Sequence, residues 1–287
     1  VLIALKEVAK RRPTAVDDHL SLFVEGLRAD EDRRAVASVA LAAVARSTPG
    51  ALITQSDTLV SILDTEDPDR LDGGVVEILS VLAAERPTVV ESHLDDIVAV
   101  LEATDDWRVA PYPVRILHNV SDENAESVVP YVGRVADALS AYDPETCEST
   151  FWTDSEAYDL FTSQALWTLC RAAEVAPGQV RPHVEAVVHG FEIAEGEGSA
   201  RAAALTLARI SEDSPAAVAP HTNSSIAAHS SLFRAVPLIA AFSLAGSDHQ
   251  YAARSQQSGQ HAKGTLLILW AKMHPYCRDQ DQRVALG

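Results

Sequence analysis

Apolar residues recur along this chain with two periods, one typical of an α-helix and one of about 38 residues. Within one stretch, Val16, Leu20, Phe23, Val24 and Leu27 are spaced so that they fall on a single stripe of a helix. The longer period shows in the segment Arg12–Val16 (RPTAV), which returns at residues 86–90 as RPTVV. Two periods of this kind indicate a repeated helical unit.

Six anchor positions define the longer period, and five of them are proline. The anchors are Pro13, Pro49, Pro87, Ala125, Pro177 and Pro215, with spacings of 36, 38, 38, 52 and 38 residues. Eight residues before each anchor stands a leucine: Leu5, Leu41, Leu79, Leu117, Leu169 and Leu207. The residues five before and three after each anchor are aliphatic as well. We call these recurring apolar positions the register.

The register predicts an all-α chain of about six helical hairpins over residues 1–245. In each hairpin a first helix follows the anchor, and a second helix ends just before the next anchor. Prolines five residues after an anchor (Pro130, Pro182, Pro220) suit the first turn of a helix, where no backbone donor is lost. Because neither helix can bury its stripe alone, neighbouring hairpins must stack. Residues 1–12 match the end of a second helix, so we expect the chain to begin inside a repeat with an uncovered apolar stripe.

The pattern resembles the HEAT-repeat family in its period, its proline-led first helix and an Asp followed by Arg at the second helix. Residues 32–34 (DRR), 69–70 (DR) and 106–108 (DWR) carry that last feature. The resemblance implies a right-handed α-solenoid. It also implies an inter-repeat ladder formed by Arg34, Arg70 and Arg108, each 21 residues after its anchor.

Charge and cysteine content indicate the environment. The formal net charge is −18 and arginine greatly outnumbers lysine, which resembles proteins of halophilic archaea. In molar salt the Debye length is about 3 Å, so an acidic surface there keeps the protein hydrated and does not steer distant partners. The alternative is an acidic surface for a basic partner, and both readings disfavour nucleic acid as a ligand. Three scattered cysteines without a CxxC pair favour a reducing compartment, and we expect a cytoplasmic protein.

The fourth hairpin is 14 residues longer than its neighbours, with the surplus at about residues 141–156, between its two helices. Phe151 and Trp152 in this insertion are candidate anchors for a partner in an aromatic-poor chain. The alternative is that both rings fold back onto the flank of the stack.

Pro111 and Pro113 interrupt the second helix of the third hairpin around Tyr112. Interior prolines cost about 3 kcal/mol each, so this helix is expected to start after Pro113 or to kink there. Either change opens a notch near Trp107 and Tyr112, which are further candidate partner-binding residues.

Residues 246–287 depart from the repeat and form a linker and tail. They carry a net charge of +2, from five basic and three acidic residues, whereas the rest of the chain carries −20. A mobile tail, a poor cap or a sequence unrelated to the repeat array are the alternatives.

No motif for catalysis, cofactor or metal binding emerges. Four histidines lie six residues after their anchors (His19, His93, His183, His221), with Gln55 and Tyr131 at the same position in the other hairpins. Stacked helices lie about 10 Å apart, too far for these side chains to share a metal ion. His274 and Cys277, with His249 and His261, do not have a recognised zinc spacing.

We therefore expect a non-catalytic scaffold or regulatory subunit that binds a protein or peptide. The alternatives are a HEAT-like enzyme of the lyase or DNA glycosylase type, and a repeat fragment of a larger signalling or membrane-associated protein.

Overall fold

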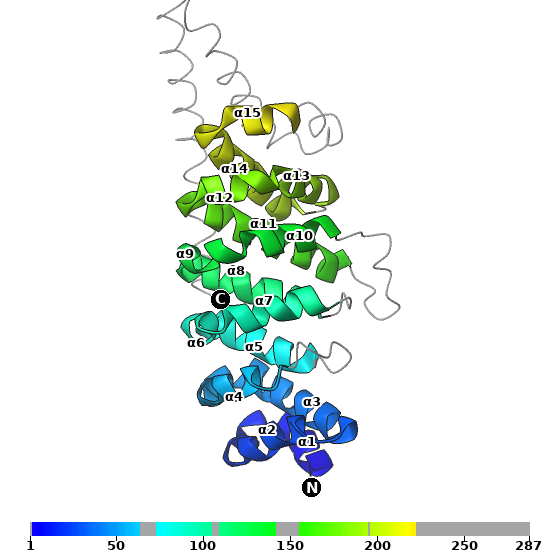
Figure 1. Ribbon diagram of the computed structural model, residues 1–287. Coiled ribbons are helices and arrows are strands. Elements are labelled where there is room, and N and C mark those ends of the chain that lie inside the picture. Colours follow the sequence, from blue (N-terminus) through cyan, green and yellow to red (C-terminus); the bar gives the residue numbers. More distant parts are fainter. Residues whose placement is uncertain (1, 64–72, 105–108, 142–154, 195, 222–287) are drawn as a thin grey trace, which may run out of the picture.

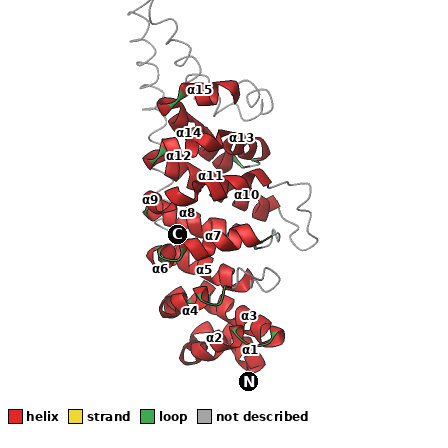
Figure 2. Cartoon of the chain, in the orientation of Figure 1, coloured by secondary structure: helices red, strands yellow, loops and turns green. Residues whose placement is uncertain are grey.

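The computed structural model describes residues 2–63, 73–104, 109–141, 155–194 and 196–221, with side chains from residue 160 onward in the fourth of these stretches. Every regular element in these stretches is helical, which confirms the all-α prediction for the described part of the chain (Figure 2). Within the described residues no helix is long and apolar enough to cross a membrane. The insertion's residues 142–154, the tail and the boundary at residue 245 lie outside the described residues.

The second helices of the hairpins form one row, which we call the B row. Its members are α1 (Leu2–Arg11), α3 (Glu31–Ser47), α5 (Gly73–Glu85), α8 (Pro111–Glu123), α11 (Ser155–Val175) and α14 (Glu197–Asp213). The helix α3 shows how such a helix starts, since the Asp30 side chain accepts a hydrogen bond from the backbone N–H of Arg33 at 3.1 Å. Glu31 and Asp32 in its first turn and Arg46 in its last complement the helix dipole.

In the five hairpins whose first helix is fully described, that helix is split, whereas the sequence predicted one continuous helix. A leading segment begins at or near the anchor, and an α-helix follows it; together these elements form the A row. The leading segments are η1 (Pro13–His19), η2 (Pro49–Gln55), α6 (Thr88–Glu91), α9 (Ala125–Val128) with η4 (Val129–Tyr131), α12 (Pro177–Val180) with η5 (Arg181–His183), and α15 (Pro215–Val218) with η6 (Ala219–His221). The α-helices that follow are α2 (Leu20–Leu27), α4 (Ser56–Val60), α7 (Leu94–Ala103), α10 (Val132–Ala141) and α13 (Val184–Ile193). Each of these α-helices begins directly after the residue six positions past the anchor.

All six anchors share one backbone turn. The N–H of the residue before the anchor donates to the carbonyl four residues earlier, at 2.7–2.8 Å in every hairpin. The N–H two residues after the anchor donates back to the residue before it, at 3.0–3.3 Å. A proline at the anchor fits because that position needs no donor and because proline favours extended backbone in the residue before it. Ala125 makes the same turn, so proline favours the turn but is not required for it.

Successive hairpins pack layer on layer into an elongated stack, with α1 at one end and α15 at the other (Figure 1). In the B row α1 contacts α3, and contacts continue in order through α5, α8, α11 and α14. In the A row α7 contacts α10, and α10 contacts α13. The two rows touch within each hairpin, as α2 does with α3 and α10 does with α11.

The register residues form the core between these layers. The leucines from Leu41 to Leu207 are buried, as are the aliphatic residues three positions after each anchor, from Val16 to Val218. The first helix differs, because Leu5 is only partly buried and Val8 is 40% exposed. The apolar side chain of Ile3 is also exposed, so α1 presents the uncovered apolar stripe expected from the sequence.

The paired prolines of the third hairpin lie at the start of α8. The helix begins at Pro111, so both prolines fall in its first turn, where proline is tolerated. The expectation of a start after Pro113, or of a kink, is therefore wrong, because neither proline occupies an interior position of the helix.

Candidate partner-binding surface

The binding residues predicted from the sequence are distributed unevenly between described and undescribed parts of the chain. Phe151, Trp152 and Trp107 lie outside the described residues, and their roles remain predictions. Tyr112 lies in the first turn of α8 and packs partly against the core. Burial raises the pKa of the Tyr112 hydroxyl, and the negative charge of Glu77 adds to the effect. Tyr112 is thus held in place and only partly exposed.

The predicted arginine ladder is represented by Arg34 alone, because Arg70 and Arg108 lie outside the described residues. Arg34 is partly buried near the start of α3. Its buried Nε has no hydrogen-bond partner in the described part of the chain. The ladder at this position therefore remains a prediction.

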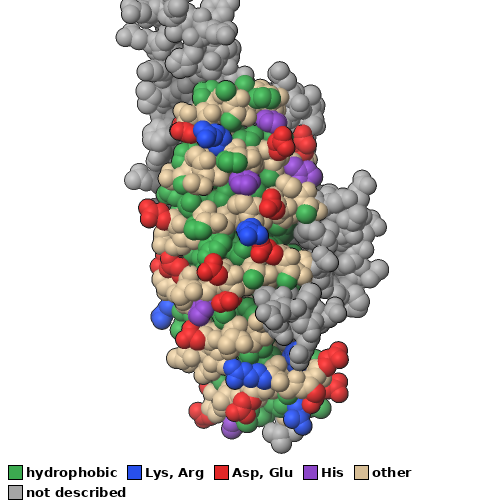
Figure 3. Space-filling model, in the orientation of Figure 1, with side chains coloured by type: hydrophobic (Ala, Val, Ile, Leu, Met, Phe, Trp, Pro, Cys, Tyr) green, Lys and Arg blue, Asp and Glu red, His purple; other side chains and the backbone are tan. Residues whose placement is uncertain are grey.

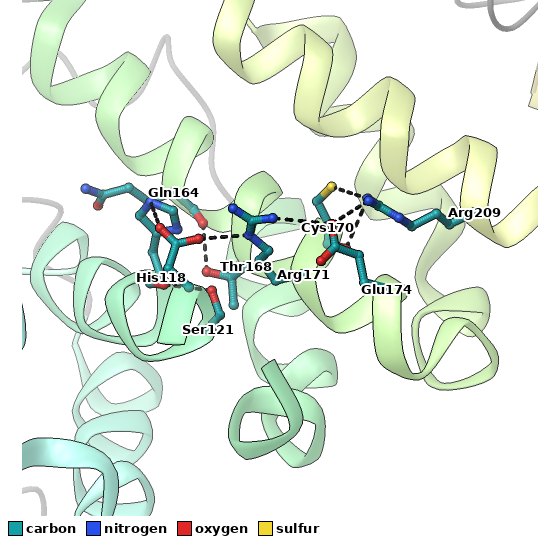
Figure 4. A network of polar contacts seen from close by, with 9 residues as sticks. His118, Ser121, Gln164, Thr168, Cys170, Arg171, Glu174 and Arg209 are labelled. Atoms are coloured by element: carbon teal, nitrogen blue, oxygen red, sulfur yellow. Dashed lines mark hydrogen bonds and ion pairs between the residues drawn. The ribbon is translucent and has the colours of Figure 1, made fainter. Parts of the chain in front are cut away.

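A different line of polar side chains runs along the B row, and we call it the polar strip. It consists of Arg46 on α3, Glu77 on α5, Tyr112, Arg115, His118 and Asp122 on α8, Arg171 and Glu174 on α11, and Arg209 on α14. Arg46 pairs with Glu77, which links α3 to α5. The strip continues from α8 to α14 as the network shown in Figure 4.

Arg171 is the centre of this network. Its Nε donates to Asp122 Oδ1 at 2.8 Å, and its second hydrogen bond goes to Glu174 Oε1 at 3.3 Å. The guanidinium also lies over the ring of Trp167, 5.8 Å from its centroid, which is cation–π distance. One arginine therefore joins the ends of two neighbouring layers and holds an aromatic ring beside them.

Arg209 repeats this arrangement one layer further on. Its guanidinium pairs with Glu174 and donates to Cys170 Sγ at 2.7 Å. Burial raises the pKa of the Cys170 thiol, although the nearby charge of Arg209 acts in the opposite direction. A thiol kept neutral in this way is a weak nucleophile, so Cys170 is a hydrogen-bond partner within the network.

The His118 side chain is less exposed than any of the ion-pairing side chains of the strip. Its Nε2 lies 3.7 Å from Asp122 Oδ2, and its Nδ1 is buried without a hydrogen-bond partner among the described residues. Burial lowers the pKa of His118; Asp122 opposes this effect, while Arg171 and Arg115 add to it. The imidazole is therefore neutral at pH 7.

Sequence reasoning missed the polar strip, although a signal for it exists. Arg171 and Arg209 both stand six residues before an anchor, and Asp122 and Glu174 both stand three before one. Six residues before the first three anchors the chain has Glu7, Ala43 and Val81, and three residues before them it has Lys10, Arg46 and Ala84. A pattern confined to the later hairpins is hidden in a search for features that every repeat shares.

The A row carries a second set of contacts between layers, made by the residue six positions after the anchor. His93 Nε2 lies 2.9 Å from Asp57 Oδ1, and the hydroxyl of Tyr131 donates to Asp95 Oδ1 at 2.8 Å. Burial raises the pKa of Tyr131 to about 12, with the hydrogen bond to Asp95 as a further cause, so the hydroxyl stays a donor. Each contact joins one hairpin to the carboxylate eight positions after the preceding anchor.

The contact with Asp57 gives His93 a structural role between layers. Among the described residues, no three His, Cys, Asp or Glu side chains gather in a way that could hold a metal ion. His274 and Cys277, with His249 and His261, lie outside the described residues. The A-row face turned toward the viewer in Figure 3 shows many more acidic than basic side chains along its length.

No protein-family model matches the chain, and none of the curated proteins matches it. Among solved structures, the chain is similar to the crystal structure of an engineered protein from the Northeast Structural Genomics Consortium. The sequence identity is 21%, the TM-score is 0.59, and the match covers 85% of this chain. The chain spans 62% of the length of that protein. At this identity the likeness shows a shared fold alone.

Proposed function

We propose that this chain is a right-handed α-solenoid of about six HEAT-like hairpins, and that it serves as a non-catalytic protein-binding scaffold or regulatory subunit. The observation that carries the proposal is that the repeated positions build the core, whereas positions that differ between repeats carry polar side chains on the surface. The same turn recurs at all six anchors and the register is buried in the layers after α1, while the polar strip crosses α3, α5, α8, α11 and α14. A stack of this kind presents an extended, rigid surface and suits a partner that contacts several layers at once.

The partner we propose is a protein or peptide and not a nucleic acid. The chain has a net charge of −18, and acidic side chains spread over the face shown in Figure 3. Phosphate backbones are bound mainly through neutralisation by Lys and Arg, which this surface disfavours. Titration with duplex DNA at matched ionic strength should show no saturable binding; tight, salt-sensitive binding would contradict this part of the proposal.

We further propose that the protein works in the cytoplasm of a salt-adapted archaeal cell. The support is compositional, from the acidic excess and the preference for arginine over lysine. Screening of the mutual repulsion among the carboxylates should raise the melting temperature as KCl increases from low to molar concentration. A melting temperature that stays constant or falls over this range would argue for an ordinary salt environment.

The central experiment is affinity capture in molar KCl, followed by reconstitution of the captured partner with the purified chain. We expect a stoichiometric complex in which amide hydrogen exchange slows in α8, α11 and α14. The absence of a stable partner, or protection confined to the ends of the stack, would count against the proposal.

Two surfaces compete in this experiment, and separate variants distinguish them. One variant replaces Phe151 and Trp152 in the insertion with Ala, and the other replaces Arg171 of the polar strip with Ala. Leu22→Ala on α2 is the matched control, since Leu22 is an exposed apolar residue of the A row, outside the polar strip. Loss of binding by either test variant, with retention by the control, assigns the surface.

A further inference from the structure

The middle of the polar strip carries the side-chain types that dominate protein interfaces. Tyr112 and Arg115 lie one turn apart on α8, and Trp167 and Arg171 lie one turn apart on α11. The pair Arg171–Asp122 joins the two helices, and the charges of both Arg115 and Arg171 reach His118, which lies on α8 between Arg115 and Asp122. Each of the four side chains is partly buried, so that it is positioned by the stack and keeps some surface exposed. Tyr, Trp and Arg in such partly enclosed positions are the usual hot spots of interfaces.

Arg115 differs from the other arginines of the strip in its ion pairing. Arg46, Arg171 and Arg209 pair with Glu77, Asp122 and Glu174, in that order. No carboxylate within the described residues comes within ion-pairing distance of Arg115, although its charge reaches both Tyr112 and His118. Among the described residues, no carboxylate therefore competes for its guanidinium donors, which match a planar, bidentate acceptor.

The local charge balance of the strip is opposite to that of the chain. Four arginines face three carboxylates along the strip, whereas the chain as a whole carries −18. Most of this molecule repels an acidic segment, and the place that favours one is an arginine without a carboxylate partner among the described residues. In molar salt the Debye length is about 3 Å, so the long-range part of this attraction is screened and only groups in direct contact still attract one another. A bidentate hydrogen bond between Arg and a carboxylate, beside an aromatic ring, is a direct contact of this kind.

We propose that Arg115, flanked by Tyr112 and Trp167, binds a carboxylate side chain of an acidic partner peptide whose adjacent apolar side chain packs on Trp167. The inference rests on the proposed scaffold function and adds the chemistry of the partner and the place where it binds. An acidic peptide is attracted to Arg115, which has no carboxylate partner among the described residues, and a basic peptide is attracted to the acidic surface elsewhere. The two classes of peptide therefore separate the two surfaces.

A random peptide library displayed on phage, selected on the intact chain in molar KCl, tests the proposal. We expect enrichment of peptides with Asp or Glu next to an aromatic or large aliphatic residue. Enrichment of basic peptides, or no enrichment above the uncoated support, would overturn the proposal. Because the library reports on short peptides, its failure leaves the capture of a folded partner as a separate test of the scaffold function.

Variants of single arginines locate the site. Arg115→Gln should weaken an enriched acidic peptide by about tenfold, the value of one good charge-assisted contact. Arg86→Gln, at an exposed arginine between α5 and α6, is the matched control and should change the affinity less than twofold. Thermal unfolding checks that both variants remain folded.

A charge reversal gives the strongest form of the test. Arg115→Glu should abolish binding of the acidic peptide and select Lys in place of Asp or Glu when the library is panned again. Equal affinity of the wild type and Arg115→Gln for the acidic peptide would show that the carboxylate binds elsewhere. Equal binding of the peptide after its Asp and Glu are replaced by Asn and Gln would also overturn the proposal.

Discussion

The first and later hairpins of the stack are built on the same register but are linked in different ways. In α1, Val8 is 40% exposed, whereas its equivalents Val120 and Ala172 are buried between two layers. In the later hairpins Asp122, Arg171, Glu174 and Arg209 form a continuous chain of ion pairs, and the same positions of the first hairpins lack it. The apolar register thus determines that layers stack, while the polar links are particular to one region. The region with extra polar chemistry is where we place binding.

The largest expected effect is on stability, and it tests whether the register residues of interior layers are more buried than those of α1 because layers cover them on both sides. Leu117→Ala removes a fully buried register side chain from α8 and should lower the free energy of unfolding by about 2–5 kcal/mol. Leu5→Ala removes the equivalent, partly buried side chain of α1 and should cost less than half as much. Urea unfolding at constant salt measures both.

The same experiment includes Leu79→Ala on α5, another fully buried register leucine, which should behave like Leu117→Ala. Equal and small losses for all three variants would show that the register does not describe the core. A loss at Leu5 as large as at Leu117 would show that α1 is covered as well as the interior layers are.

A second prediction concerns how closely the two rows approach in the later hairpins. A Cβ added at Gly190 of α13 would lie 2.9 Å from Leu139 Cδ2 and 3.0 Å from Leu166 Cδ2, both on buried side chains. Gly190→Ala should therefore destabilise the fold by about 1–3 kcal/mol, as overpacking does. Thermal or urea unfolding measures the change.

The control substitutions come from one repeat position in both regions. Gly50 and Gly178 each follow an anchor, and a Cβ at either would meet nothing within 4 Å. Gly50→Ala and Gly178→Ala should be neutral or stabilising by up to about 1 kcal/mol. Destabilisation by these two equal to that of Gly190→Ala would mean that the helix contact at α13 is not the cause.

The third prediction compares the ion pairs of the two regions by double-mutant cycles. Arg171 and Asp122 belong to a network of ion pairs that joins α8, α11 and α14, so their coupling should reach about 1 kcal/mol at low salt. Arg46 and Glu77 form an isolated pair with a more exposed arginine, and their coupling should be about 0.5 kcal/mol or less. Both couplings should decrease in molar KCl, and a larger coupling for Arg46–Glu77 would contradict the network argument.

Features that repeat were predictable from the sequence, and features confined to one region were not. The leucine register and the proline anchors identified which residues are buried and where hairpins turn, because stacking imposes the same requirement on every layer. The division of the first helix at the residue before Leu20 or Leu94 was not predicted, since a short turn and a longer helix can share one apolar stripe. Pro111 was taken for an interior position because the start of α8 depends on the preceding loop.

The candidate site shows the same limit more strongly. Arg171 and Arg209 share an offset from their anchors, but only the packing of α8, α11 and α14 brings Asp122 and Glu174 within reach of them. The aromatic candidate Tyr112 was identified from the prolines on either side of it, and its partly buried position follows from α8 packing that no local pattern contains. Predicting a partner-binding surface made from side chains of several layers therefore requires knowing how far neighbouring helices are shifted along one another. The period of the sequence does not contain this information.

The smallest expected effect uses pH to test the buried part of the polar strip. His118 occupies a position that holds Ala42 and Ser80 in earlier hairpins, and burial lowers its pKa below the ordinary value of 6.5. The unfolded chain takes up a proton on this residue near pH 6.5, while the folded chain does so only at lower pH. His118 therefore supports stability above pH 6.5, and this contribution is lost as the pH falls below that value.

The unfolding free energy of the wild type should decrease more steeply between pH 7 and pH 5 than that of His118→Gln. Because Asp122 stabilises the protonated form and Arg171 and Arg115 oppose it, Arg171→Gln should make the wild-type slope shallower. Identical slopes in all three proteins would mean that His118 is as accessible to protons in the fold as in the unfolded chain.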